Sequence, residues 1–274
     1  MAGLLVAKLG GRLAASPEAL GRVARDAARL AGEGWRLVLV HGGGDLVSEY
    51  SRRLGVEPRI VVSPSGVRSR YTTLEELEVY TMVMAGLLNK RLAAALQAAG
   101  LRALGVSGVD CGLLRAARKE RIVILNERGR PQVVPGGYTG RITSVDTRCL
   151  QALLGAAEVL AVAPLALGPG GTLLNVNGDQ AAAAIASAAG ASALVFLTDA
   201  PGVVLDGAVL GEVGRGELEG VIGRVGQGMR VKLIMASRAL DGGVPLVVVG
   251  DGRVEEPLSR ALAGSNGTLI RGGP

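Results

Sequence analysis

Histidine and cysteine are almost absent from this chain of 274 residues. The single histidine, His41, cannot support a histidine-based metal site or a Ser-His-Asp triad elsewhere in the chain. The two cysteines, Cys111 and Cys149, are too few for a disulfide framework and lack metal-ligand spacing, so we predict two small, buried or half-buried side chains. Any chemistry performed by the chain is therefore expected to work without imidazole.

Aromatic residues and long apolar runs are also scarce. Aromatics make up 2% of the chain and do not alternate with basic residues, which argues against nucleic acid as a partner. No apolar run approaches the roughly 18 residues of a membrane span, and the N-terminus leads directly into a predicted strand rather than a signal peptide. We therefore expect a cytoplasmic protein that does not bind membranes.

Basic residues, by contrast, are in excess and are nearly all arginine. The formal net charge of +6 favours an acidic partner, either a protein or a polyanionic small molecule. Only four of the 30 basic residues are lysines: Lys8, Lys90, Lys119 and Lys232. Because ammonium and guanidinium groups are not interchangeable at a phosphate, lysine is expected where a compact, mobile cation is required. Lys8 and Lys232 lie beside glycine-rich turns.

The apolar pattern alternates between strands and helices and predicts an α/β fold. Strands are predicted at 4–9 and 37–40, and a helix between them begins at Ser16-Pro17. This order favours a mainly parallel open sheet sandwiched by helices. We place a domain boundary near Gly190. Further strands are predicted at 159–162, 193–197 and 246–249, and further helices at 45–54, 179–189 and 229–240.

A long helix and a β-hairpin interrupt this alternation. Residues 73–76 form a capping box that opens a helix running to Gln97, which places Arg68 in a loop at the helix entrance. Residues 122–125 and 132–134 predict the two strands of a hairpin, followed by a glycine-rich segment at 136–140.

Two glycine turns follow the first two predicted strands. Gly10 and Gly11 come just after Lys8, and His41 is followed by the three glycines of 42–44. Backbone N–H groups approach an anion most closely where no Cβ intervenes, so these turns predict phosphate binding. For either turn alone, a plain strand-to-helix connection is the alternative.

Three polar segments occur later in the chain. Residues 175–180 supply an amide and a carboxylate at a helix start, where open α/β folds bind ligands, although an ordinary N-cap has the same pattern. Residues 198–203 end a strand with a polar turn, and 226–232 begin a helix that carries Lys232 in its second turn. Walker and Rossmann fingerprints are both missing, which argues against those nucleotide-binding folds.

In order and spacing, these segments resemble the amino acid kinase superfamily and, within it, the acetylglutamate kinases. The resemblance runs through 8–11, 41–44, 66–68, 175–180, 198–203 and 226–232. Residues 65–72 and 135–140 look like the branch that phosphorylates an amino acid attached to LysW, a small acidic carrier protein, in lysine or arginine biosynthesis. The resemblance implies the amino acid kinase fold, with an amino-acid-substrate, carrier-facing lobe at 1–190 and a nucleotide-binding lobe at 191–274.

The resemblance also implies a role for each matched residue. Lys8 and Lys232 would stabilise the transferring and leaving phosphates, and Asp179 would hold the two lysines in place. Arg68 would pair with the second carboxylate of the substrate, and Asn175 would bind the substrate through its amide. The remaining implied roles are phosphate binding by Gly10 and Gly11, substrate binding by Gly43 and Gly44, and nucleotide binding by Thr198, Asp199, Gly202, Gly228 and Met229.

The implied reaction transfers the γ-phosphoryl group of ATP to a side-chain carboxylate, with Mg²⁺ held mainly by ATP. No general base is needed, because a carboxyl group with a pKa of about 4.3 is already ionised at neutral pH. The substrate would be α-aminoadipate, glutamate or both on the carrier, and the enzyme a homodimer. Weaker candidates for touching the carrier are Arg70, Lys90, Arg91 and the hairpin.

Three alternatives remain open from the sequence. A plain acetylglutamate kinase would phosphorylate free N-acetylglutamate with the same phosphate chemistry. A uridylate or aspartate kinase would need base recognition or a regulatory domain, and the chain is too short for the latter. A non-catalytic relative would bind ATP or an acidic amino acid to control a partner, but the presence of both lysines and Asp179 argues against it.

Overall fold

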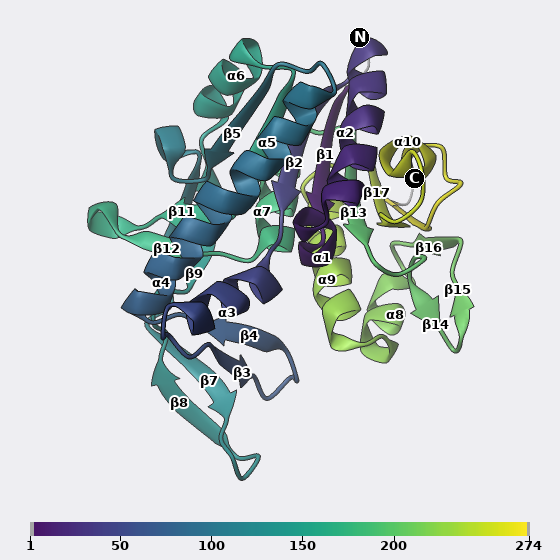
Figure 1. Ribbon diagram of the computed structural model, residues 1–274. Helices are drawn as coiled ribbons and strands as arrows, with labels where there is room; N and C mark the ends of the chain where they lie inside the picture. The colour runs from purple at the N-terminus through teal and green to yellow at the C-terminus, as the bar shows by residue number, and fades with distance from the viewer. Residues whose placement is uncertain (1–2, 273–274) are drawn as a thin grey trace.

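One sheet of eight strands crosses the molecule in this computed structural model, which describes residues 3–272 (Figure 1). Every neighbouring pair is parallel except β17 with β18, so the predicted α/β fold with a mainly parallel open sheet is confirmed. The strands, in spatial order, are β16 (Glu212–Gly214), β18 (Thr268–Arg271), β17 (Leu246–Asp251), β13 (Ala193–Thr198), β1 (Leu4–Leu9), β2 (Arg36–His41), β10 (Val159–Ala163) and β5 (Ala103–Ser107).

The expected boundary near Gly190 divides this sheet into two halves. Strands β1, β2, β10 and β5 come from residues before it, and β13, β17, β18 and β16 come from residues after it. The halves are joined without a break, because β1 pairs with β13 along five residues, from Leu5 opposite Ala193 to Leu9 opposite Leu197. All strands at the β1–β13 seam are parallel, but the order in which the chain adds strands changes side there, and open α/β sheets bind ligands at such a position.

Helices cover both faces of the sheet, and alternation along β1 decides which side chains meet them. Leu5, Ala7 and Leu9 face the first layer, whereas Val6 faces the second. Lys8 is two residues from Val6 and therefore points to the second layer. The first layer contains α2 (Pro17–Gly32), α5 (Asn89–Ala98) and α10 (Pro257–Leu262), and the second contains α6 (Thr147–Ala156), α7 (Gly178–Ala188), α8 (Leu218–Arg224) and α9 (Gln227–Asp241).

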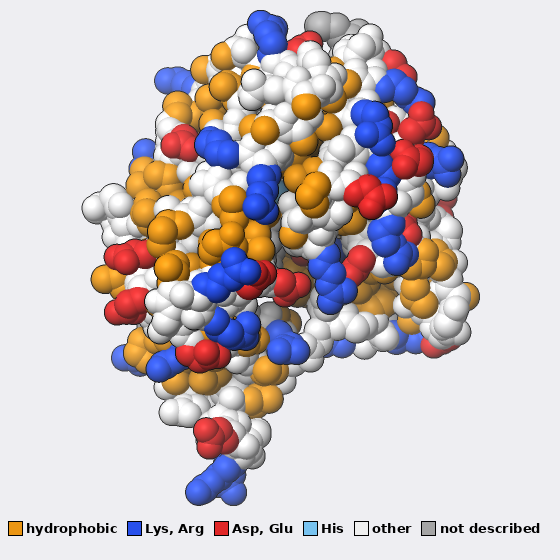
Figure 2. All heavy atoms as spheres, viewed as in Figure 1, with side chains coloured by type: hydrophobic (Ala, Val, Ile, Leu, Met, Phe, Trp, Pro, Cys, Tyr) orange, Lys and Arg blue, Asp and Glu red, His pale blue; other side chains and the backbone are white. Residues whose placement is uncertain are grey.

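A smaller sheet and two hairpins lie beyond the carboxyl ends of the main strands. The predicted hairpin is confirmed as β7 (Arg121–Leu125) paired with β8 (Pro131–Pro135), and it projects from the rest of the molecule in Figures 1 and 2. A second hairpin, β3 (Arg59–Val62) with β4 (Arg68–Tyr71), lies beside it. The smaller sheet consists of β12 (Leu173–Asn175), β11 (Leu165–Leu167), β6 (Leu114–Arg118) and β9 (Gly140–Val145).

The expectation that Arg68 lies in a loop is wrong, because Arg68 belongs to this second hairpin. Arg68 is the first residue of β4 and not a loop residue, because it pairs with Val62 across a tight turn. In that turn Ser63 N donates to Val67 O at 2.9 Å, and Gly66 has the positive φ of +82° that the turn requires. The Arg68 side chain is exposed.

The predicted long helix forms, but its middle is not an α-helix. Thr73 caps it as expected, since its hydroxyl accepts a hydrogen bond from Glu76 N at 3.2 Å. The helical segment then runs through α4 (Leu74–Thr81), a π-helix η1 (Met82–Leu88) and α5 to Ala98. Apolar periodicity does not reveal this wider turn, and π-helical segments occur frequently at functional sites.

Several short elements complete the description. Within residues 3–272, no helix is both long and apolar enough to cross a membrane. The short elements are α1 (Gly11–Ala15), α3 (Gly44–Arg53), the 3₁₀ turns η2 (Asp110–Gly112) and η3 (Pro169–Gly171), and the pair β14 (Val204–Leu205) and β15 (Ala208–Val209).

Candidate active site

The two glycine turns pack directly against each other at the carboxyl ends of β1 and β2. A Cβ on Gly11 would lie 3.0 Å from the backbone N of Gly43, and a Cβ on Gly42 would lie 3.0 Å from the backbone N of Gly11. Gly42 N donates to Leu9 O at 2.8 Å and holds the second turn beside the first. Glycine is therefore required here by the close approach of two backbones.

Each glycine turn leads into a helix whose first N–H groups have no side-chain cap. Helix α1 begins at Gly11 and α3 at Gly44, and neither N-cap residue accepts a hydrogen bond through a side chain. Unpaired N–H groups at a helix start carry partial positive charge and favour an anion. Helix α9, which follows Gly226, also lacks a side-chain cap.

Three charged side chains distant in sequence meet beneath these turns. Lys8 Nζ lies 2.9 Å from Asp179 Oδ1, and Lys232 Nζ lies 3.2 Å from Asp179 Oδ2. The side chains of Lys8, Asp179 and Lys232 are only 10%, 7% and 14% exposed. They come from β1, α7 and α9, so the cluster bridges the β1–β13 seam.

Electrostatics couples these three groups. Burial opposes ionisation of Asp179, but the two neighbouring lysines outweigh it and hold the pKa of Asp179 below its ordinary value. Burial, together with the charge of Lys8, lowers the pKa of Lys232 although Asp179 counteracts this. Two ammonium groups share one carboxylate, so a positive charge remains in excess and is available to an anion.

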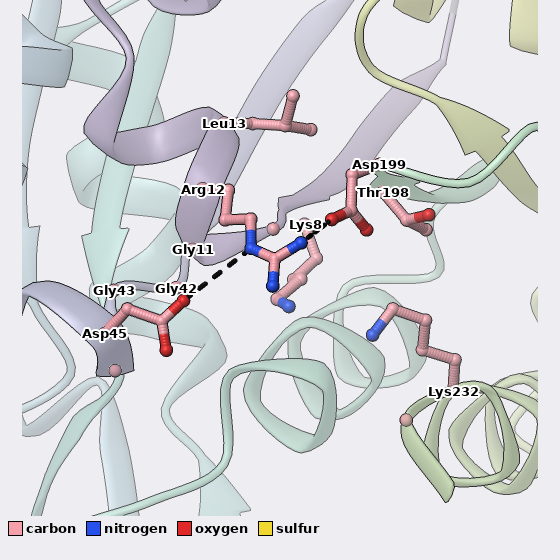
Figure 3. Close-up of a pocket in the computed structure, with 13 residues that line it drawn as sticks. Lys8, Gly11, Arg12, Leu13, Gly42, Gly43, Asp45, Thr198, Asp199 and Lys232 are labelled. Atoms are coloured by element: carbon pink, nitrogen blue, oxygen red, sulfur yellow. Dashed lines mark hydrogen bonds and ion pairs between the residues drawn. The ribbon is translucent and has the colours of Figure 1, made fainter. Parts of the chain in front are cut away.

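The two lysines of the cluster and the glycine turns line one cavity of about 580 Å³, whereas Asp179, which holds both lysines, does not line it. Figure 3 shows Lys8 entering it from β1 and Lys232 reaching toward Lys8 from α9. The structure therefore brings most of the predicted residues together, although their roles remain predictions. The predicted residues that line this cavity are Lys8, Gly10, Gly11, Gly43, Gly44, Thr198, Asp199, Gly228 and Lys232.

Arg12 also lines this cavity, and the sequence analysis did not identify it. Its Nη1 lies 2.7 Å from Asp199 Oδ2, and its Nε lies 3.8 Å from Asp45 Oδ2, so it spans the cavity between two acidic side chains (Figure 3). The side chain is 76% exposed, which makes these pairs weak and the guanidinium free to exchange partners. The sequence feature that could have identified Arg12 as a site residue is its position directly after Gly11.

A second cavity of about 530 Å³ adjoins the first and shares Gly42, Gly43 and Gly44 with it. Predicted substrate residues Arg68 and Asn175 line it, and Asn175 Nδ2 donates to Thr72 Oγ1 at 2.9 Å. The shared glycines therefore connect the predicted phosphate site to the predicted substrate site.

The second cavity is strongly cationic. Besides Arg68 it is lined by Lys119, Arg141 and Arg238, which the sequence analysis did not assign to the site, and none of its lining residues is acidic. Burial and the charge of Arg141 lower the pKa of Lys119. Cations gathered without carboxylate partners indicate a site for a ligand with several negative charges.

Of the three arginine and lysine candidates for contacting a carrier, Arg70 lines the second cavity, whereas Lys90 and Arg91 lie elsewhere. Arg70 pairs with the buried Glu76 and donates to Gly44 O at 2.7 Å, so it supports the second glycine turn. Lys90 Nζ donates to Gly105 O at 2.5 Å on α5 and β5. Lys90 and Arg91 line neither of the two cavities.

Two predicted nucleotide residues also lie outside both cavities. Gly202 has a φ of +151°, and a Cβ there would lie 2.9 Å from Thr268 Oγ1, so this glycine allows the 198–203 turn to approach β18. Met229 is half-buried and packs against the core on the side of α8 and α9. Their assignment to the nucleotide remains a prediction.

Two known sequences are similar to this chain over nearly its full length. A protein of Metallosphaera sedula named LysW-aminoadipate/LysW-glutamate kinase is 43% identical over 97% of this chain and 100% of its own length. A protein of Aeropyrum pernix, whose name marks it as a candidate for the same kinase, is 48% identical over 98% of this chain and 97% of its own length.

Solved structures share the fold. An N-acetylglutamate synthase of Neisseria gonorrhoeae, in complex with coenzyme A and N-acetyl-glutamate, has a TM-score of 0.82 at 27% identity over 99% of this chain. The chain spans only 60% of that synthase. A carbamate kinase of Giardia lamblia bound to AMP-PNP has a TM-score of 0.68 at 14% identity, with 99% of each chain covered, and shows likeness of fold alone.

The sequence profile described as the Amino acid kinase family matches residues 3–250. This match covers most of the chain, and the two relatives are at least 43% identical over nearly its full extent. The chain therefore belongs to the amino acid kinase family.

Proposed function

We propose that this protein transfers the γ-phosphoryl group of ATP to the side-chain carboxylate of an amino acid carried by LysW. The product is an acyl phosphate of LysW-linked α-aminoadipate, LysW-linked glutamate or both. The observation that carries the proposal is the buried Lys8–Asp179–Lys232 cluster beneath two glycine turns. The carrier-linked substrate is supported by the names of the relatives at 43% and 48% identity.

The cluster suits phosphoryl transfer to a carboxylate. The acceptor is already ionised at neutral pH, so the protein has to bring two anions together and neutralise charge that moves during transfer. Lys8 approaches from β1 and Lys232 from α9, and both can contact the transferring group and the leaving phosphates. Asp179 fixes both ammonium groups before the substrate arrives, which lowers the cost of reorganisation in the transition state.

The residues of the first cavity fit a nucleotide that brings its own metal ion. They offer ammonium groups, a guanidinium and glycine N–H groups, and residues 3–272 contain no group of three or more His, Cys, Asp or Glu side chains arranged to hold a metal. We therefore assign Mg²⁺ mainly to the phosphate oxygens of ATP, where it would offset part of their charge. The nucleotide would extend from Lys8 and Lys232 toward 198–203 and the start of α9.

The second cavity is the proposed substrate site. Its connection through Gly43 and Gly44 would place the reacting carboxylate next to the phosphate, while Arg68 and Asn175 bind the rest of the amino acid. Lys119 directly follows β6 and Arg141 lies on β9, the two strands that flank the projecting hairpin. We assign these cations and the hairpin to the acidic carrier.

The resemblance to the family further supports a cytoplasmic homodimer. Sedimentation of the purified protein tests the dimer, and a monomer at micromolar concentration would contradict it.

The decisive experiment offers the protein Mg-ATP with one of three acceptors: LysW-linked aminoadipate, LysW-linked glutamate or free N-acetylglutamate. Hydroxylamine traps an acyl phosphate as a hydroxamate. We expect hydroxamate with a carrier-linked acceptor and little with N-acetylglutamate. Preference for free N-acetylglutamate would identify an acetylglutamate kinase, and ATP binding without turnover of any acceptor would identify a non-catalytic sensor.

A further inference from the structure

The two cysteines, which the proposed reaction does not use, are neighbours in the structure. Cys149 lies in the first turn of α6, and Cys111 lies in η2, 38 positions earlier. Cys149 Sγ is 3.8 Å from the carbonyl oxygen of Asp110, the residue before Cys111.

The backbone holds the two cysteine segments together independently of the thiols. Asp146 N donates to Leu113 O at 2.9 Å, which ties the start of α6 to the end of η2. Asp146 also caps α6 by accepting a hydrogen bond from Cys149 N at 2.9 Å. On the other side, the Asp110 carboxylate accepts from Ser107 N at 2.6 Å and fixes η2 to the end of β5. Both cysteines therefore sit on anchored backbone.

The two thiols differ in access. Cys149 is buried, whereas Cys111 is exposed, contrary to the expectation that both would be at least half-buried. Cys111 occupies a left-handed turn position with a φ of +56°, next to Gly112. Burial, the Cys111 thiol and the nearby carboxylates of Asp146 and Asp110 raise the pKa of Cys149 to about 12. An oxidant therefore meets Cys111 first, and Cys149 is the resolving thiol.

We propose that Cys111 and Cys149 form a reversible intramolecular disulfide. With glutathione disulfide as oxidant, the Cys111 thiolate attacks one glutathione sulfur and releases the first glutathione. Cys149 then loses its proton, attacks Cys111 Sγ and releases the second. The two cysteines together lose two electrons and two protons, and one glutathione disulfide becomes two glutathione thiols.

The disulfide would close a loop that contains β6, the β7–β8 hairpin and β9. Such a loop restricts the unfolded chain, so oxidation is expected to stabilise the folded protein without a change in the fold. For a loop of this length in a chain of this size, we expect the melting temperature to rise by roughly 5–8 °C. Since η2 and α6 line neither the first nor the second cavity, ATP binding should not change.

The test incubates the intact protein with glutathione disulfide and then measures free thiols, intact mass and melting temperature. We expect both thiols to disappear without a retained glutathione, the melting temperature to rise, and dithiothreitol to reverse both effects. In Cys111→Ser the remaining thiol should survive and the melting temperature should not respond to oxidant.

A second variant, at the buried Cys149, tests the resolving thiol separately. Cys149→Ala should keep the fold, accept one glutathione on Cys111 and show no oxidant-dependent rise in melting temperature. The proposal is overturned if the unmodified protein retains two glutathiones or keeps both thiols. It is equally overturned if the melting temperature rises to the same extent in Cys111→Ser.

Discussion

Asp179 is the residue on which the arrangement of the reaction centre depends. Its carboxylate binds two ammonium groups, one from β1 and one from α9, at 2.9 and 3.2 Å. The spatial distance between Lys8 and Lys232 could not be predicted from local patterns, because most of the chain separates the two residues. Their convergence was predicted only through the family resemblance, whereas the glycine turns were predicted from the physics of backbone approach.

Removal of either ammonium group should abolish efficient transfer. We expect Lys8→Ala and Lys232→Ala each to lower kcat by about a hundredfold or more, because preorganised charge at the transition state contributes several kcal/mol. Hydroxamate formation with the carrier-linked substrate measures the rate, and thermal unfolding checks the fold. Lys90→Ala is the matched control, since Lys90 lines neither cavity. A rate near that of the unaltered protein in either cavity variant would remove its assigned role.

His41 should make stability depend on pH. The imidazole is completely buried at the end of β2, and burial is the main cause that lowers its pKa to about 4. The unfolded chain takes up a proton near pH 6.5 while the folded chain does not, so stability is lost as pH falls from 6.5 toward 4. We expect the His41 contribution to drop by about 2 kcal/mol between pH 7 and 5.

Urea unfolding at pH 7 and 5 measures this dependence. The comparison with His41→Gln isolates the imidazole from the carboxyl groups that titrate in the same range. An equal loss of stability in both proteins would show that His41 is not responsible.

At the scale of elements, the helix starts could be predicted because a helix cap is formed by residues that are close together in the sequence. Ser16 caps α2 by accepting from Ala19 N at 3.2 Å, and Asn177 caps α7 by accepting from Gln180 N at 3.0 Å, both as the sequence indicated. The short strands β11, β12, β16 and β18 were not predicted. They have three or four residues each. Strands β11, β16 and β18 depend on pairing with strands far along the chain, and β12 pairs with β11, so no local pattern specifies these strands.

The π-helix and the second glycine turn form one packed unit. A Cβ on Gly43 would lie 2.1 Å from Leu88 Cδ1 and 2.9 Å from Met84 Sδ. We expect Gly43→Ala to displace the turn, lower kcat at least tenfold and reduce the melting temperature. Gly86→Ala, in the same π-helix but with open space at its Cβ, should change both far less. Equal effects of the two substitutions would exclude this packing as the reason for glycine.

At the scale of the molecule, lysine content was more informative than net charge. Of the four lysines, Lys8 and Lys232 line the first cavity and Lys119 lines the second, whereas Lys90 supports β5. The overall charge could not locate the cationic cavity, because most arginines are paired on the surface or solvated. Tertiary contacts decide which arginine and lysine side chains lack a carboxylate partner.

Asp26 joins the two ends of the chain. Its buried carboxylate accepts from Leu258 N at 2.7 Å and Ser259 N at 3.0 Å, and also from the Ser259 hydroxyl, so a residue of α2 caps α10. We expect Asp26→Ala to lower the free energy of unfolding by about 2 to 3 kcal/mol, because buried donors lose an ionised acceptor. Urea unfolding measures it. Glu18→Ala on the same helix removes only an exposed pair and should cost under about 0.5 kcal/mol; similar losses would contradict the capping role.

The β1–β13 seam also has a kinetic consequence. Strand β1 occupies the middle of the main sheet, yet one of its two neighbours begins nearly 190 positions later. Pairings this remote form slowly, since a long stretch of flexible chain must be ordered first. On dilution from denaturant, catalytic competence should therefore return later than bulk helix content measured by circular dichroism. Simultaneous recovery of the two signals would mean that the centre of the sheet assembles early.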